Sequence, residues 1–184
     1  MDYQFRKTPR APFLNYEEGC YFVTICTKNM AQYLGHISDK KMYLSAIGLF
    51  LDEQIRKASE FYPQIEVPHF VVMPNHLHMI LLIKPTERTP SSVVERDYLI
   101  NRCPVPFLRH TDNLPRQIPT LSKYVNSLKG SVSKFAKGNN PDFGWQSRYH
   151  DHRIRNHQEY EHIANYIQCN VPNWTQDRFF SDAE

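Results

Sequence analysis

The sequence predicts an α+β fold in which an antiparallel sheet carries helices on one face. Three observations favour this class. Stretches rich in β-branched and aromatic residues are typical of strands, two stretches with apolar residues three and four apart predict helices, and a Pro-Asn pair inside the most apolar stretch marks a hairpin. The 184 residues fit one domain, and 41% of them are hydrophobic, which is enough to build a core.

The first part of the chain contains a strand and then a helix. Residues 1–18 are polar and include two prolines, so we expect an irregular arm there. Residues 20–27 form the first strand, and the connection at 29–43 has room for a short extra strand. Apolar residues at helical spacing then predict a helix of about four turns, which Pro63 ends. These residues are Leu44, Ile47, Leu51, Ile55 and Ala58.

The Pro-Asn pair joins two strands, at about 64–73 and 76–84. Successive side chains of a strand point to opposite faces, so His76 and His78 share one face of the second strand. The opposite face of that strand carries Leu77, Met79, Leu81 and Ile83.

The second half begins with a long irregular stretch and ends in helices. Residues 85–118 contain five prolines and show no periodicity, so we expect an inserted loop. Helical spacing returns at Thr120 and stops near Gly138. Residues 143–154 have the aromatic content of a short strand, and Asn156 can cap a last helix that runs to about residue 169.

Without the insertion and the last helix, the order is strand, helix, strand, strand, helix, strand. This is the split βαβ plan of ferredoxin-like folds. The strand at 76–84 is central in that plan, and its aliphatic face is the one that the helices cover. The two histidines would then lie on the open face, which the C-terminal helix could cover.

Composition favours a cytoplasmic protein. No apolar run is long enough to span a membrane, and the first residues lack the apolar core of a signal peptide. The four cysteines are scattered and form no Cys-x-x-Cys pair, which fits reduced thiols rather than a disulfide framework.

The positive charge of the chain is concentrated in one region. The net charge is only +3, but residues 120–160 hold seven Lys or Arg residues against three acidic ones. A local basic field suits a polyanion, although an ordinary solvated surface explains the charges equally well. The candidate DNA contacts in this region are Lys123, Lys129, Lys134, Arg148 and Arg153.

Two pairs of residues could carry chemistry. His76 and His78 can converge on one ion, although histidines satisfied by hydrogen bonds are the common alternative. Tyr166 and Asn170 are four residues apart and therefore lie on one face of the last helix. Imidazole nitrogens and an amide oxygen suit Mg²⁺ or Mn²⁺ in an incomplete shell that leaves room for a phosphate oxygen. A phenol one turn away could then attack the phosphorus.

These residues match a known pattern. His76-Leu77-His78 resembles the HUH motif of single-tyrosine transposases, and Tyr166–Asn170 resembles their tyrosine helix. The similarity is greatest to the REP-associated tyrosine transposases and covers most of the chain outside the arm and the insertion. It rests on four segments in the family's order, which are Val23–Lys28, Met73–His78, Trp145–Asn156 and Tyr166–Asn170.

The resemblance implies a metal-dependent endonuclease and strand transferase that acts on single-stranded DNA. Tyr166 would attack the scissile phosphate and form a 5′-phosphotyrosine link. His76, His78 and Asn170 would hold Mg²⁺ or Mn²⁺. The substrate would be hairpin DNA from palindromic repeats, and the protein would act as a monomer or a homodimer.

Several alternatives stay open at this point. Tyr149 and Tyr160 are rival nucleophiles, and His162 could assist proton transfer from one turn before Tyr166. Trp145 fits a core better than a base-stacking platform. The chain could also be a mobile insertion-sequence transposase, a non-catalytic module that binds hairpin DNA, or a hydrolase with a metal-bound water as nucleophile.

Overall fold

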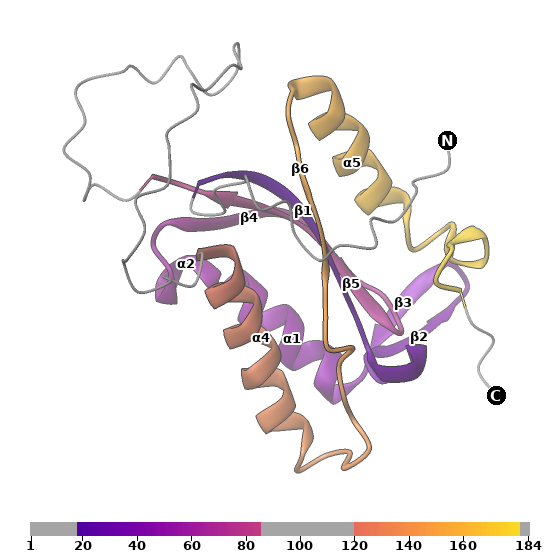
Figure 1. Cartoon of the computed structure of the whole chain (residues 1–184). Helices are drawn as coiled ribbons and strands as arrows, with labels where there is room; N and C mark the ends of the chain where they lie inside the picture. The colour runs from indigo at the N-terminus through magenta and orange to yellow at the C-terminus, as the bar shows by residue number, and fades with distance from the viewer. Residues whose placement is uncertain (1–17, 86–119, 181–184) are drawn as a thin grey trace, which may run out of the picture.

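A four-stranded antiparallel sheet lies at the centre of the computed structural model, which describes residues 18–85 and 120–180 (Figure 1). The strands are β1 (Gly19–Cys26), β4 (Ile65–Val72), β5 (His76–Ile83) and β6 (His150–Arg153). Their order across the sheet is β4-β5-β1-β6, and each neighbouring pair is antiparallel. This is the ferredoxin-like order, so the predicted fold class is confirmed. The expected arm at 1–18 and the insertion at 85–118 lie almost entirely outside the described residues.

Helices cover both faces of this sheet. The helices are α1 (Ala46–Arg56), α2 (Ala58–Phe61), α4 (Thr120–Ala136) and α5 (His157–Cys169). Figure 1 shows α1, α2 and α4 on one face and α5 on the other. Among the described residues, no helix combines the length and the apolar character needed to cross a membrane.

The two faces of β5 pack against different partners. Its aliphatic side chains, such as Leu77 and Met79, are fully buried with α1 and α4 in the main core. Ile80 lies on the other face in a smaller cluster with Ile163 and Ile167 of α5. This division confirms the predicted alternation, and it leaves His76 and His78 on the face that α5 covers.

Some local predictions differ from the structure. The connection at 29–43 contains a full hairpin, β2 (Gly35–Ser38) and β3 (Lys41–Leu44), preceded by the short helix η1 (Lys28–Met30). Leu44 therefore ends a strand instead of starting the helix. The expected strand at 143–154 is shorter, because only β6 pairs with β1 and Trp145 makes a single bridge to Thr27.

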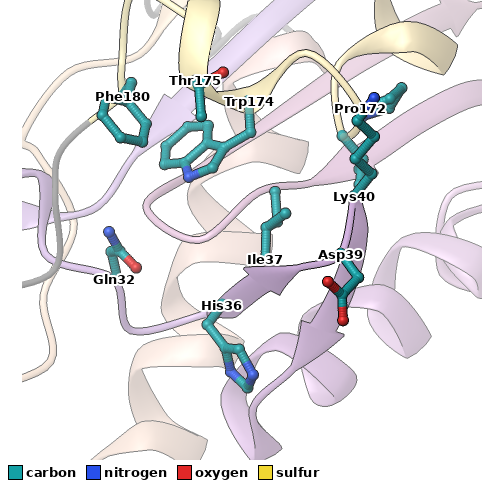
Figure 2. A pocket seen from close by; sticks show the side chains of 10 residues that line it. Gln32, His36, Ile37, Asp39, Lys40, Pro172, Trp174, Thr175 and Phe180 are labelled. Carbon is teal, nitrogen blue, oxygen red and sulfur yellow. The ribbon is translucent and has the colours of Figure 1, made fainter.

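The hairpin β2–β3 lies beside the C-terminal segment that follows α5 (Figure 2). That segment continues from Asn170 into a second short helix, η2 (Trp174–Gln176). Trp174 is buried and faces Ile37 of the hairpin across a cavity. The hairpin and the tail thus form one end of the molecule, next to the turn between β4 and β5.

The first turn of α5 depends on Asn156, as predicted. Its side-chain oxygen accepts a hydrogen bond of 2.8 Å from the Glu159 amide, which would otherwise lack a partner within the helix. We expect Asn156→Ala to lower the free energy of unfolding by about 1 kcal/mol. Asn156→Asp keeps a capping oxygen and should stay near the wild-type value in urea unfolding followed by circular dichroism. Equal losses in both variants would contradict the capping role.

Candidate metal and nucleophile site

The histidine pair lies at the start of β5, directly after the turn from β4. His76 and His78 expose 0% and 2% of their surface, and their ring centroids are 4.5 Å apart. The turn is held in place by two bonds to the Asn75 carbonyl, since Thr27 donates from its amide and from its hydroxyl. The central position of β5 therefore fixes both imidazoles on one rigid, buried surface.

Hydrogen bonds from neighbouring residues orient the two rings. The Asn75 amide nitrogen donates to the Phe179 carbonyl, so its Oδ1 accepts from His76 Nδ1 at 2.8 Å. His76 Nε2 then carries a lone pair. His78 Nδ1 lies 2.8 Å from the Thr24 hydroxyl, which can donate or accept and so supports either tautomer. Both Nε2 atoms therefore point to the side of the rings away from these partners, in the way that outer hydrogen bonds orient metal-binding histidines.

Tyr166 reaches this surface from α5. Its hydroxyl lies 3.2 Å from His78 Nε2 and donates a 3.1 Å hydrogen bond to Asp177 Oδ2. Its ring packs edge-on against Phe22, and 37% of its surface stays exposed. The phenol is therefore fixed beside the histidines and still open to a substrate.

Asn170 and Asp177 complete the cluster. Asn170 is the C-cap residue of α5, 3% exposed, and its amide nitrogen donates to Asp177 Oδ2 at 3.0 Å. The second carboxylate oxygen, Oδ1, accepts from the Phe179 amide at 2.7 Å, and this bond holds Asp177 in place after η2. Asp177 was not a sequence-predicted site residue, and it has no spacing relation to the histidines that could have identified it.

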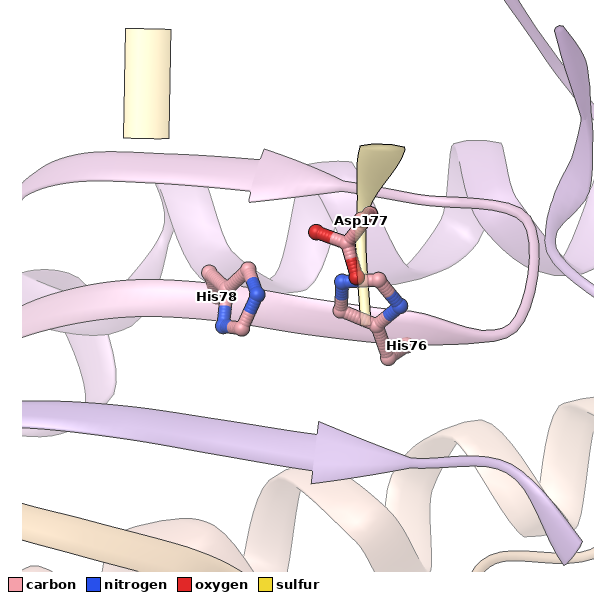
Figure 3. Close-up of side chains that lie close together, drawn as sticks. All are labelled: His76, His78 and Asp177. Carbon is pink, nitrogen blue, oxygen red and sulfur yellow. The ribbon is translucent and has the colours of Figure 1, made fainter. Parts of the chain in front are cut away.

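The ligand atoms of His76, His78 and Asp177 all lie within 4.8 Å of one another (Figure 3). Among the described residues, two buried polar atoms at this site have no hydrogen-bond partner, His76 Nε2 and Asn170 Oδ1. Buried polar atoms are normally satisfied, and a bound cation would satisfy the unpaired Nε2 of His76 and could satisfy the Asn170 oxygen. The donor set of imidazoles, amide oxygen and carboxylate fits Mg²⁺ or Mn²⁺.

Burial sets the ionisation of the cluster. It lowers the pKa of His76 to about 4 and the pKa of His78 well below its usual value, so both rings are neutral near pH 7 and can act as ligands. Burial, together with the negative charge of Asp177, raises the pKa of Tyr166 to about 12. The phenol thus stays protonated unless positive charge is placed beside it.

A comparison with known proteins finds a relative over nearly the whole chain. No protein-family model matches the chain. A protein of Haemophilus influenzae (strain ATCC 51907 / DSM 11121 / KW20 / Rd), described as uncharacterized, is 33% identical over 181 residues, which span 96% of this chain and 94% of that protein. The two chains belong to one family.

A solved structure of a REP-associated tyrosine transposase bound to a REP hairpin superposes with a TM-score of 0.52. The match covers 95% of this chain and 74% of that one, at 19% sequence identity. This chain has the fold of a REP-associated tyrosine transposase. At this level of identity the likeness concerns the arrangement of strands and helices, so the roles of single residues rest on the geometry described above.

The contacts of the three candidate tyrosines differ. Tyr149 packs against the main core, with its hydroxyl 3.3 Å from Ser122 Oγ on α4. Tyr160 packs with the smaller cluster, and its ring meets that of His69 at 5.7 Å. Of the three tyrosines, Tyr166 is the one whose hydroxyl contacts the histidine pair.

Trp145 packs against the main core, and its indole nitrogen donates to the Lys129 carbonyl. This placement agrees with the sequence-based preference for a core role over base stacking. His162 is an exposed residue of α5, one turn before Tyr166. Its part in proton transfer stays a prediction.

The lysines of α4 lie on the other face of the sheet from the tyrosine helix. Lys123 and Lys134 are exposed on α4, which lies on the other face of the sheet from α5 (Figure 1). Lys129 is half-buried, its ammonium donates to the Gln146 carbonyl at 2.7 Å, and burial lowers its pKa. The other two candidates are Arg148, which is exposed, and Arg153, which lies at the end of the edge strand β6.

Proposed function

We propose that this protein is a metal-dependent endonuclease and strand transferase for single-stranded DNA, with a transposase-like reaction at hairpin or palindromic sequences. Tyr166 is the proposed nucleophile. His76, His78 and Asn170 would hold Mg²⁺ or Mn²⁺, and Asp177 adds negative charge beside them. The observation that supports the proposal most strongly is the contact of the Tyr166 hydroxyl with His78 Nε2, next to two unpaired buried acceptors.

The chain's own groups account for the steps of strand cleavage. The Tyr166 oxygen forms a bond to phosphorus while the bond from phosphorus to the 3′-oxygen breaks, which gives a 5′-phosphotyrosine and a free 3′-hydroxyl. The phenolic proton moves along the hydrogen bond to Asp177 Oδ2 and is returned to the leaving 3′-oxygen. A divalent cation in this site supplies the positive charge that polarises the phosphate and favours the ionised phenol.

Strand joining is the reverse of this reaction. A 3′-hydroxyl attacks the phosphotyrosine, the bond to Tyr166 breaks, and the phenol regains its proton. The energy of the cleaved phosphodiester is kept in the protein link, so the transfer needs no external energy source. Hairpin DNA is the proposed substrate because the chain shares its fold with a transposase that was solved on a REP hairpin.

The decisive experiment uses end-labelled hairpin oligonucleotides with single-stranded flanks, drawn from palindromic repeats of the host genome. The protein is incubated with them in Mn²⁺, in Mg²⁺ or in EDTA and then denatured. We expect a labelled protein band that survives denaturant in either metal and is absent in EDTA. Cleavage without such a band would favour a metal-bound water as nucleophile. Binding without cleavage in either metal would favour a non-catalytic DNA-binding module.

The exposed lysines of α4 give a separate prediction about DNA affinity. Each ammonium that neutralises a phosphate of duplex DNA adds about 0.9 to the slope of log K against log salt. Lys123→Gln combined with Lys134→Gln should therefore flatten this slope by about two units in anisotropy titrations with a hairpin stem. A matched control removes two charges that are already paired, Lys57 with Glu53 and Lys84 with Glu66. Equal slopes for both double variants would place the DNA away from α4.

A further inference from the structure

A cavity of about 390 Å³ opens beside the metal and nucleophile site. It lies between the β2–β3 hairpin and the C-terminal segment from Val171 to Phe180 (Figure 2). This volume is within the range of small-ligand pockets, which is roughly 300–1,000 Å³. The site described above does not include the cavity, so the cavity has no role in the proposed function.

One aromatic ring separates the cavity from the histidine pair. The Trp174 indole lines the cavity, and its centroid lies 6.0 Å from that of the His76 ring. Phe180 also lines the cavity and meets Trp174 edge-on at 5.3 Å. A group bound in the cavity would therefore lie close to a phosphate that occupies the His76 site.

The lining suits a flat ring with a polar edge. Ile37, Val171 and Pro172 supply apolar surface, and Figure 2 shows the Ile37 side chain pointing from β2 toward Trp174. The Phe180 ring is 37% exposed, so one of its surfaces is open to a stacking partner. The polar residues of the lining are Gln32, His36, Asp39, Lys40 and Thr175.

The hairpin that forms one wall has a tightly defined turn. Asp39 and Lys40 both have positive φ, at 50° and 57°, as a two-residue turn of the I′ type requires. The turn brings the exposed Lys40 to the cavity, where its charge can meet a backbone phosphate. A nucleotide has this combination of a flat base, a polar base edge and a phosphate.

We propose that the cavity binds one unpaired base of the DNA strand, next to the phosphate that Tyr166 attacks. The base stacks on Phe180, and the polar groups of the cavity lie around its edge. This inference rests on the proposed function and adds to it, because a base held there would help to select the cleavage position. Base–aromatic contacts of this kind are sequence-tolerant unless a polar partner reads the base edge.

The test identifies the position in the single-stranded flank at which the contribution of the base to binding affinity depends on Phe180. Fluorescent hairpin oligonucleotides carry one abasic site at each flank position in turn, and binding is followed by anisotropy in Mn²⁺. All proteins carry Tyr166→Phe to prevent cleavage. At one flank position, removal of the base should lower the affinity for the protein by roughly 5- to 150-fold, the range expected for one stacked base. In Phe180→Ala that loss should vanish, while abasic effects at the other positions stay unchanged.

Phe61→Ala is the matched control, because Phe61 is 67% exposed on α2, on the other face of the sheet. This variant should keep the full abasic loss. The inference is overturned if no flank position shows a loss, or if Phe180→Ala keeps the same loss as the control. Adduct formation is measured separately, with the protein that has the native Tyr166. Absence of the adduct would count against the proposed chemistry, whereas the binding data alone test whether the cavity binds a base.

Discussion

Tyr166→Phe is expected to abolish the covalent protein–DNA adduct and DNA cleavage while the protein still folds and binds DNA. The substitution removes one oxygen, and the ring can keep its edge-on packing against Phe22. Loss of the only group that forms the covalent link should reduce cleavage by about 10⁴-fold or more. The measurement is the labelled adduct after denaturation, together with anisotropy for binding and circular dichroism for the fold.

Two further tyrosines serve as controls for this result. Tyr149→Phe and Tyr160→Phe should form the adduct at the wild-type rate, because neither hydroxyl contacts the histidine pair. Peptide mapping by mass spectrometry should find the linked nucleotide on Tyr166. A linked nucleotide on either control residue would show that the wrong tyrosine was assigned. Full cleavage by Tyr166→Phe would assign the attack to a water molecule.

The sheet and its two faces could be predicted because they depend on local patterns. The alternation of side chains along residues 76–83 fixes which of them face α1 and α4, and the structure buries those residues as expected. The spacing of four between Tyr166 and Asn170 fixes their common helix face in the same way. Such periodic features can be predicted from the sequence because each depends on a single helix or strand.

Asp177 could not be predicted for the opposite reason. It lies 11 residues after Tyr166 and outside any regular element, and its position depends on the short helix η2 and on a bond to the Phe179 amide. An acidic residue near the end of a chain is common in sequences. Only the packing of the tail against His76 brings this one to the site.

The β2–β3 hairpin was predicted only as room for one short strand, because its turn lacks the usual sequence signal. Turns of this type favour Asn-Gly or Asp-Gly, since both central residues need positive φ. Here the positions are occupied by Asp39 and Lys40, and lysine gives no indication of that conformation. The strand expected at 143–154 was predicted too long for a different reason. Its aromatic residues pack against the core from a loop, and only four residues pair with β1.

The second large effect concerns metal binding by the histidine pair. We expect His76→Ala and His78→Ala each to weaken Mn²⁺ binding by at least about 100-fold, since loss of an outer hydrogen bond to a ligand alone costs 10- to 100-fold. Electron paramagnetic resonance counts free Mn²⁺ directly, so the result does not depend on DNA cleavage. Adduct formation should fall with metal occupancy in both variants.

Both histidines are buried, so a packing defect must be separated from the loss of a ligand. His76→Gln and His78→Gln fill more of the space and should restore stability without restoring wild-type affinity for Mn²⁺. Asn170→Ala should weaken binding less, because an amide oxygen donates less strongly than an imidazole, and Asp177→Asn tests the charge beside the site.

His162→Ala is the control for surface histidines, and it should bind Mn²⁺ as the wild type does, because His162 is an exposed residue of α5 outside the ligand cluster. The expected order of affinities is therefore wild type and His162→Ala first, Asn170→Ala next, and the two histidine variants last. If a folded double variant of His76 and His78 kept the wild-type affinity for Mn²⁺, the metal would not bind on this face of the sheet. The unpaired Nε2 of His76 would then need another partner, such as a hydroxyl group that donates a hydrogen bond to it.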